Sequence, residues 1–233
     1  MIPIPWYYMW SDKYSFFHEL FQHTMKEPFD VRPIYIDQSI FDKGLGVANG
    51  HVWNNCLIKV DEIIRVLETA EHPYILFTDV DLVIQRQDIR EKLQPHIDAR
   101  HSMVFLQEGH QLNIGFMLFM VCKEVVDFWK EIRARVVAEG GLDQSYVNEE
   151  MKRWPLPWGA FDPQQFTCSN TWDRVTHFSV LQPLSSCLGK ESDFAEKVFC
   201  ASRFLDVNPF ISHVPREILP YVAKMQEFFT KQR

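Results

Sequence analysis

YILFTDVDLVI, residues 74–84, is the most informative stretch of this sequence for the fold class. An apolar run, Tyr74–Thr78, reaches two aspartates, Asp79 and Asp81, and a second apolar run, Leu82–Ile84, follows. A short and wholly apolar run is typical of a central strand covered on both faces of its sheet. Ligands of open α/β sheets bind outside the carboxyl ends of the strands, so the two aspartates are expected at the ligand-binding edge.

Strand-like and helix-like segments alternate around this stretch. Periodic apolar residues predict strands at residues 2–9, 31–37, 103–107 and 114–121, and helices at residues 15–26, 51–69, 88–96 and 123–138. This order predicts one α/β domain over residues 1–233, with a Rossmann-like, mostly parallel central sheet and helices on both faces. A short helix at 143–152, irregular segments to about 209 and a last helix at 215–231 are expected to form an irregular C-terminal cover.

Composition excludes several classes of protein. The chain has 233 residues, 46% of them hydrophobic, which is enough for a sizeable core. Its net charge of −7, with no basic run, argues against nucleic-acid binding, which needs clustered Lys and Arg. No apolar stretch approaches the roughly 20 residues of a membrane span. The oligomeric state stays open.

The two aspartates of the central stretch indicate a metal site. Two neighbouring carboxylates repel each other unless a cation or a proton lies between them. Oxygen ligands of this kind suit Mg²⁺ or Mn²⁺, which are usually held together with phosphates and waters of a substrate. A turn with two solvated acids is the alternative, but such turns rarely lie inside so apolar a run.

Four segments together resemble a known family. YILFTDVDLVI resembles the DxD segment of GT-A fold glycosyltransferases, which use nucleotide-diphospho-sugar donors, and an amphipathic helix with Lys59 precedes it as in that family. LNIGFMLF, residues 112–119, resembles the strand where donor sugar and acceptor meet in that family, and LDQSYVNEEM, residues 142–151, resembles its DQ segment at a helix start. The resemblance covers about residues 1–152 and one C-terminal histidine. It implies a nucleotide-binding half over residues 1–110 and an acceptor-side half with the C-terminal cover over residues 111–233.

The resemblance also implies roles for single residues. Mn²⁺ or Mg²⁺ would be held by Asp79, Asp81 and His213, with His177 as the competing histidine. His213 is preferred because a loop just before the last helix can fold back over a diphosphate. The residues implied at the nucleotide-sugar are Trp6, Tyr7, Tyr8, Lys59, Asp79, Val80, Asp81, Asn113, Gly115 and Gln144.

The implied reaction moves a sugar from a UDP- or GDP-sugar to an acceptor hydroxyl, expected on a glycan. An inverting enzyme needs a general base, for which Asp143 is the first candidate and Glu108 the second, whereas a retaining enzyme needs none. Asp143 also suits a helix N-cap without any chemistry. Tyr7 and Tyr8 also fit a core, Lys59 a solvated helix face and Gly115 close strand packing.

Three other functions compete. A haloacid-dehalogenase-like Mg²⁺-dependent phosphatase also has DxD after an apolar strand, but no second acidic pair such as GDxxxD follows here. A dinucleotide-binding domain would need GxGxxG, and GLGVANG at residues 44–50 has one residue too many. A non-enzymatic binding module could use the tryptophan-rich stretch Trp154–Trp158 as a platform.

The cysteines and the N-terminus suggest a compartment. The chain has five cysteines at wide spacing without CxxC, which favours free thiols in a reducing environment. The N-terminal MIPIPWYYMW has no basic region before its apolar residues, so it is not interpreted as a signal peptide. The expected location is cytoplasmic; the alternative is the soluble catalytic part of a Golgi-type enzyme that lacks its anchor.

Overall fold

The structure is a computed structural model of the whole chain. It describes residues 3–12, 18, 21–22, 25–37, 39–40, 47–48, 51–52, 54–80, 82–84, 88–163, 165–167 and 211–213. For residues 47–48, 51–52, 54–55, 83–84, 167 and 211–213 the description is of the backbone alone.

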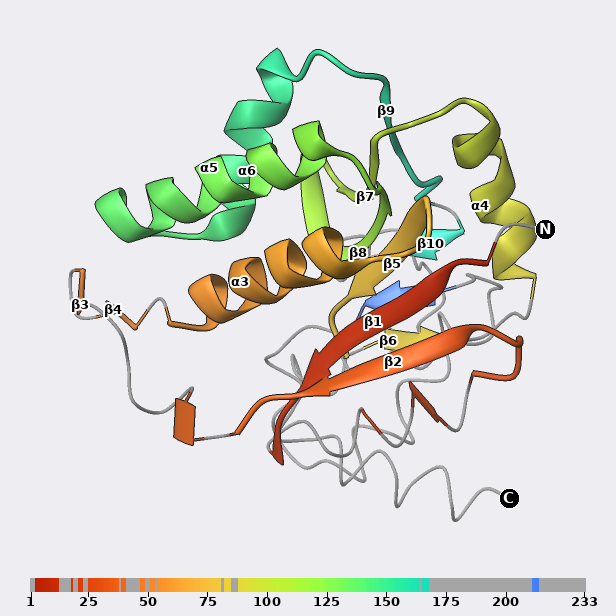
Figure 1. Cartoon of the computed structure of the whole chain (residues 1–233), viewed down its shortest axis with the longest axis horizontal. Coiled ribbons are helices and arrows are strands. Elements are labelled where there is room, and N and C mark those ends of the chain that lie inside the picture. The colour runs from red at the N-terminus through yellow and green to blue at the C-terminus, as the bar shows by residue number, and fades with distance from the viewer. Residues whose placement is uncertain are drawn as a thin grey trace, which may run out of the picture.

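A six-stranded sheet forms the centre of the molecule (Figure 1). Its strands, from edge to edge, are β2 (Asp30–Tyr35), β1 (Pro5–Trp10), β5 (Tyr74–Thr78), β8 (Gln111–Met120), β7 (Met103–Glu108) and β9 (Trp158–Ala160). Only β8 runs against the other strands of this sheet, because it pairs antiparallel with both β5 and β7 while the remaining pairs are parallel. The carboxyl ends of β1, β2 and β5 therefore lie at one edge.

One face of the sheet is covered by α3 (Asn54–Thr69), α5 (Lys123–Glu139) and α6 (Asp143–Glu150) (Figure 1). The apolar stripe of α3, with Val60, Ile63 and Leu67, is buried against side chains of β5, β7 and β8. Helices α3 and α5 also pack directly on each other. Burial of these stripes fixes α3 and α6 against the sheet, which matters because both carry candidate site residues.

The opposite face is aromatic and is closed by α4 (Ile89–Asp98). Because side chains alternate along a strand, Trp6 points away from the α3 face and meets Phe116 edge-to-face at 5.4 Å between ring centroids. Phe116 in turn contacts Phe161, and Phe161 contacts His96 of α4. Helices therefore cover both faces of the sheet.

Two small sheets flank the central one. Strands β3 (Val47–Ala48) and β4 (His51–Val52) form an antiparallel pair before α3. The second sheet has the order β10 (Phe166–Thr167), β11 (Ile211–His213) and β6 (Leu82–Ile84). Strand β11 pairs antiparallel with β6, which brings the backbone of residues 211–213 beside the segment that follows Asp79.

The predicted α/β class, with a mostly parallel sheet and helices on both faces, is confirmed. Most of the predicted boundaries differ by one to three residues; the strand predicted from residue 2, for example, begins at Pro5. The helix predicted from residue 51 begins at Asn54, because residues 51–52 belong to β4. The strand predicted from residue 114 begins at Gln111, directly after a two-residue turn in which Gly109 has φ +58°. The helix predicted at 143–152 ends at Glu150 and continues as the 3₁₀ turn η2 (Met151–Arg153).

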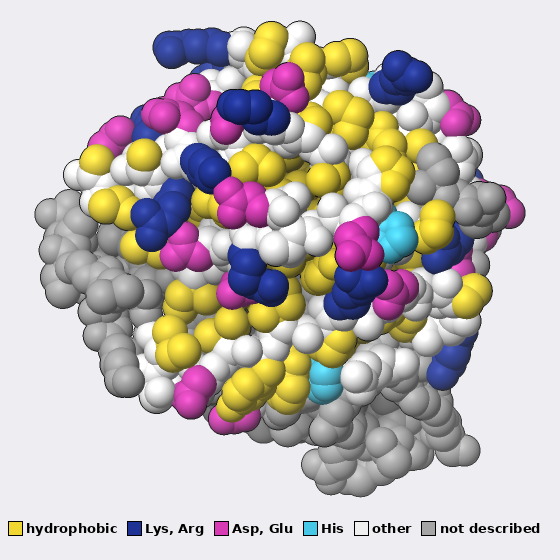
Figure 2. Space-filling model, viewed as in Figure 1, with side chains coloured by type: hydrophobic (Ala, Val, Ile, Leu, Met, Phe, Trp, Pro, Cys, Tyr) yellow, Lys and Arg dark blue, Asp and Glu magenta, His cyan; other side chains and the backbone are white. Residues whose placement is uncertain are grey.

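The predicted helix at 215–231 and most of the one at 15–26 lie outside the described residues. In the described part of the chain, no helix is long and apolar enough to cross a membrane. Two of the cysteines, Cys56 and Cys122, are described and both are free thiols. On the face shown in Figure 2, basic and acidic side chains are interspersed. Lys130 of α5 forms an ion pair with Glu68 of α3 at 2.6 Å.

Candidate active site at the carboxyl end of β5

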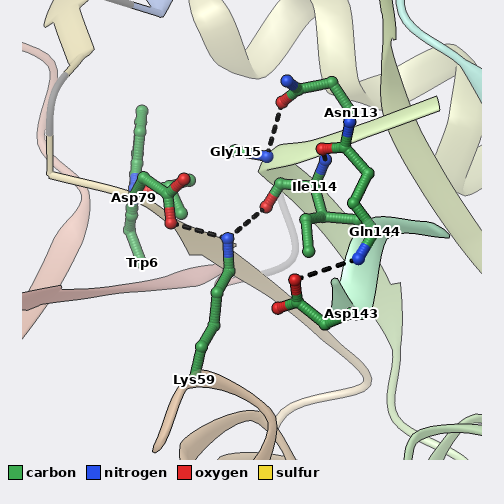
Figure 3. A network of polar contacts seen from close by, with 9 residues as sticks. Trp6, Lys59, Asp79, Asn113, Ile114, Gly115, Asp143 and Gln144 are labelled. Carbon is green, nitrogen blue, oxygen red and sulfur yellow. Dashed lines mark hydrogen bonds and ion pairs between the residues drawn. The ribbon is translucent and has the colours of Figure 1, made fainter. Parts of the chain in front are cut away.

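Lys59 connects three segments of the candidate site (Figure 3). Its ammonium group on α3 donates to Oδ1 of Asp79 at 2.6 Å and to the carbonyl oxygen of Ile114 on β8 at 2.8 Å. The backbone N–H of Asp79 donates to the carbonyl of Gly115 at 2.9 Å. The side chain of Lys59 is 13% exposed and that of Asp79 is 29% exposed, so the aspartate is anchored but accessible.

The LNIG motif forms an irregularity in β8. The pairing of β7 with β8 jumps from Phe105 opposite Met117 to Leu106 opposite Asn113, so residues 114–116 bulge from that ladder. Inside this bulge the side chain of Asn113 accepts a hydrogen bond from the N–H of Gly115 at 2.7 Å. The bulge therefore places two backbone carbonyls, those of residues 114 and 115, beside Lys59 and Asp79.

Asp143 lies at the start of α6, on the other side of Lys59 from Asp79 (Figure 3). It is only 6% exposed, and burial raises the pKa of its carboxyl, while the Lys59 ammonium and the N–H of Gln144 oppose that rise. The thiol of Cys56 lies beside this carboxylate, and burial together with the nearby Asp143 raises the pKa of Cys56 to about 11. A carboxylate with a raised pKa is a stronger base than a solvated one.

The N-cap interpretation of Asp143 is wrong. Leu142 occupies the N-cap position, and Asp143 is the first helical residue. The Asp143 carboxylate accepts the N–H of the next residue, Gln144, at 2.9 Å rather than an N–H further along the first turn. Its burial beside Lys59 is thus unrelated to capping.

Glu108 ends β7 next to the same group of residues. Its Oε2 accepts hydrogen bonds from the amide of Asn113 at 2.7 Å and from the amide of Gln144 at 3.4 Å. Gln144 also accepts the N–H of Ile114 at 3.3 Å through its side-chain oxygen. Both candidate bases, Asp143 and Glu108, therefore belong to one hydrogen-bonded network around the bulge.

The three aromatic residues expected near the nucleotide are core residues. Trp6 and Tyr8 are fully buried on one face of β1, whereas Tyr7 is buried on the other. The indole N–H of Trp6 donates to Thr78 at 2.9 Å, and the Tyr8 hydroxyl contacts His18 at 2.9 Å. Val80 is also buried, at 4% exposed. A contact of these side chains with a nucleotide stays a prediction.

Part of the expected metal site lies outside the described residues. This applies to Asp81, to His177 and to the side chain of His213. The backbone of His213 is described: it pairs with Leu82 of β6, directly after position 81. Within the described part of the chain, no three His, Cys, Asp or Glu side chains are grouped as a metal site would need.

Similar structures point to one class of fold. No protein-family model matches the sequence, and no curated protein is similar to it in sequence. Among solved structures, the chain is similar to a glycosyltransferase involved in the glycosylation of the major capsid of PBCV-1, with 10% identity, a TM-score of 0.52, and 91% of this chain and 94% of that one covered. Apo mouse xyloside xylosyltransferase 1 is similar at 13% identity and a TM-score of 0.52, with 93% and 99% covered.

A third similar structure is the apo form of glycosyltransferase GlyE of Streptococcus pneumoniae, at 11% identity and a TM-score of 0.53. The whole of this chain aligns with 64% of GlyE. The chain shares its fold with glycosyltransferases. At these identities the similarity concerns the arrangement of helices and strands.

Two residues of this glycosyltransferase-like fold were not anticipated from the sequence. Cys56 contacts Asp143, and its position one turn before Lys59 on the same helix face was the available signal. Asn148 binds the backbone of Leu112 on β8 and lies four residues after Gln144. Two amides spaced i, i+4 along α6 were the signal for a polar helix face turned toward a strand.

Proposed function

We propose that this protein is a metal-dependent GT-A-type glycosyltransferase that moves a sugar from a UDP- or GDP-sugar to an acceptor hydroxyl of a glycan. The observation that carries the proposal is the anchored but accessible Asp79 carboxylate at the carboxyl end of a central strand, with Lys59 bound to it. Ligands bind at such strand ends in open α/β sheets. The fold shared with glycosyltransferases supports the same function.

Asp79, Asp81 and His213 would hold Mn²⁺ or Mg²⁺. The pairing of β11 with β6 supports this set, because the backbone of His213 lies opposite Leu82, the residue after Asp81. Carboxylate oxygens suit both ions, and an imidazole is more acceptable to Mn²⁺. When bound, such an ion stabilises negative charge on a diphosphate leaving group as a Lewis acid.

The other site residues would position the donor sugar and the acceptor. Lys59 adds a positive charge next to Asp79, where an anionic donor would lie. Asn113, Gly115 and Gln144 lie in or beside the bulge, which supports the proposal that they would contact the sugar. If the reaction inverts the anomeric centre, Asp143 takes the proton of the acceptor hydroxyl, since burial raises its pKa, and Glu108 is the second candidate.

A turnover assay tests this function. The protein is incubated with Mn²⁺, a panel of UDP- and GDP-sugars and a panel of saccharide acceptors, and the release of nucleoside diphosphate is measured. We expect release with at least one donor, loss of release with EDTA, and recovery with excess Mn²⁺. Release of phosphate from phosphomonoesters, with no donor turned over, would contradict the proposal and support the phosphatase alternative.

A further inference from the structure

Strand β8 extends beyond the end of β5 and needs other partners there. Strand β5 pairs with residues 116–120 of β8, so residues 111–115 have no β5 neighbour. The backbone groups of Leu112 and Ile114 are bonded by side chains instead. Asn148 bonds to both the N–H and the carbonyl of Leu112. Gln144 accepts the N–H of Ile114, and Lys59 donates to the carbonyl of Ile114.

Asn148 makes the most complete of these contacts. Its Oδ1 accepts the N–H of Leu112 at 2.8 Å, and its Nδ2 donates to the carbonyl of Leu112 at 2.8 Å. The same Nδ2 also donates to the carbonyl of Gln144 at 2.8 Å, one helical turn earlier. The amide thus bonds to β8 as a neighbouring strand would, while it is tied to the residue beside Asp143.

We infer that Asn148 is a positioning residue, which sets the register of α6 on β8 and so places Asp143 and Gln144 beside Lys59 and Glu108. It touches none of the reacting groups in this role. The inference rests on the proposed function for its effect on catalysis, but the register itself can be measured without any activity. Misplacement of catalytic groups by about 1 Å can cost on the order of 10²-fold in rate.

The remaining contacts of α6 explain why the helix should stay docked without Asn148. Tyr146 and Val147 are buried in the core, and the Tyr146 hydroxyl donates to the carbonyl of Gly140. Arg135 of α5 pairs with Glu149 at 2.8 Å and with Glu150 at 2.9 Å. Removal of the Asn148 amide therefore loosens the register of α6 rather than its attachment.

The decisive variants are Asn148→Ala and Asn148→Asp, with Ser145→Ala as the matched control on an exposed position of the same helix. Asn148→Ala should lower kcat by about 10–100-fold while KM for the donor changes by less than about threefold. Asn148→Asp keeps an acceptor for Leu112 but loses both donors while ionised. Its kcat relative to wild type should therefore rise as pH falls and the carboxyl becomes a donor. Ser145→Ala should match wild type.

Hydrogen exchange gives a readout that is independent of turnover. In Asn148→Ala the Leu112 amide should exchange at least about tenfold faster, because it loses its acceptor, while the amides of Ile75 and Phe77 in β5 keep wild-type rates. Unchanged exchange at Leu112, or wild-type kcat in Asn148→Ala, would overturn the inference. Faster exchange throughout β5 would also overturn it, since the role would then be general stability. Failure of the proposed function has a different outcome, in which wild type turns over no donor. The exchange rate of the Leu112 amide still tests the role of Asn148 in that case.

Discussion

At the residue scale, Lys59 organises the candidate site. Its ammonium bonds to a carboxylate on one segment and to a backbone carbonyl on another, so three stretches distant in sequence meet at one atom. Asp143 lies close enough for this positive charge to lower its pKa against the effect of burial. The same ammonium thus stabilises charge on two carboxylates, Asp79 and Asp143, which would otherwise repel each other.

The first prediction concerns Asp143. If its carboxylate is the base, Asp143→Asn should lower kcat by about 10²–10⁴-fold, the range typical of a lost general base. Donor binding should barely change, because asparagine keeps the shape and still offers an oxygen to the N–H of Gln144. In wild type, kcat/KM should fall on acidification through the raised pKa of Asp143, since only the ionised form accepts a proton.

Glu108→Gln is the matched comparison for Asp143→Asn, since both changes remove one carboxylate from the same network. Glu108→Gln should retain most of the turnover if Asp143 is the base. A fully active Asp143→Asn enzyme would remove that assignment. A large loss in Glu108→Gln alone would transfer the role to Glu108.

The second prediction concerns His96, whose Nδ1 lies 3.0 Å from Nδ1 of His101. Burial, together with the charge of His101, lowers the pKa of His96 to about 4 from its usual 6.5. The unfolded chain therefore takes up this proton at higher pH than the folded protein does. The free energy of unfolding should decrease as pH falls from 6.5 to 4, by on the order of 1 kcal/mol for this partly exposed group.

Denaturant titrations at several pH values between 4 and 7 would measure this effect. His96→Asn should flatten the acid slope of the free energy of unfolding, whereas His110→Asn, at an exposed position, should keep it. If the free energy of unfolding has the same dependence on pH in wild type and His96→Asn, the lowered pKa of His96 does not contribute to the loss of stability in acid.

At the element scale, the irregularity in β8 links fold to site. The jump in pairing at Leu106 frees the backbone of residues 114–116 from β7, so the carbonyls of Ile114 and Gly115 can accept hydrogen bonds from Lys59 and from the N–H of Asp79. The motif LNIG was identified from the sequence as part of the site, but the bulge itself was not. A pairing shift depends on which strands lie next to β8, and a local apolar pattern carries no information about that.

The third prediction concerns the start of α4. Its first backbone N–H groups, those of Ile89 and Arg90, donate to the two carboxylate oxygens of Glu27 at 2.9 and 3.1 Å. Asp88 holds the N-cap position without a side-chain cap, so Glu27 replaces it from another segment. Glu27→Ala should reduce the free energy of unfolding by about 1–2 kcal/mol, as for a lost cap.

Chemical denaturation of Glu27→Ala, Glu27→Gln and Glu71→Ala would test this cap. Glu27→Gln should lose less than Glu27→Ala, because an amide oxygen still accepts one N–H. Glu71 is exposed, so Glu71→Ala should stay within about 0.5 kcal/mol of wild type. Equal stabilities of Glu27→Ala and Glu71→Ala would contradict the capping role.

At the scale of the whole molecule, the topology of the sheet explains why site residues that are far apart in sequence lie close together in space. Strands β1, β2 and β5 end at one edge, and the reversed β8 brings its own bulge to the end of β5. Helices α3 and α6 are packed on the same face and deliver Lys59 and Asp143 to that edge. Six strands and three helices thus position one small group of polar side chains.

The sequence predicted more of this architecture than of its contacts. Strand β5 was predicted to the residue, because a wholly apolar run ends abruptly at Asp79. The start of α3 was misplaced since Val52 continues the apolar period of the helix into β4. The hydrogen bonds of Asn148 and the contact of Cys56 with Asp143 could not be predicted, because they join segments whose separation in space depends on the packing of helices against the sheet.

Asp79 and Asp81 are proposed to bind a metal–nucleotide complex. Calorimetric titration of UDP and GDP in the presence of Mn²⁺ measures this binding, with wild type, Asp79→Asn, Asp81→Asn and, as a control on the exposed side of α5, Asp127→Asn. We predict Mn²⁺-dependent, saturable binding of one nucleotide to wild type and Asp127→Asn. It should weaken at least about tenfold, or 1.4 kcal/mol, in the Asp79 and Asp81 variants. Binding of equal strength in all four proteins, or none to wild type, would contradict the account.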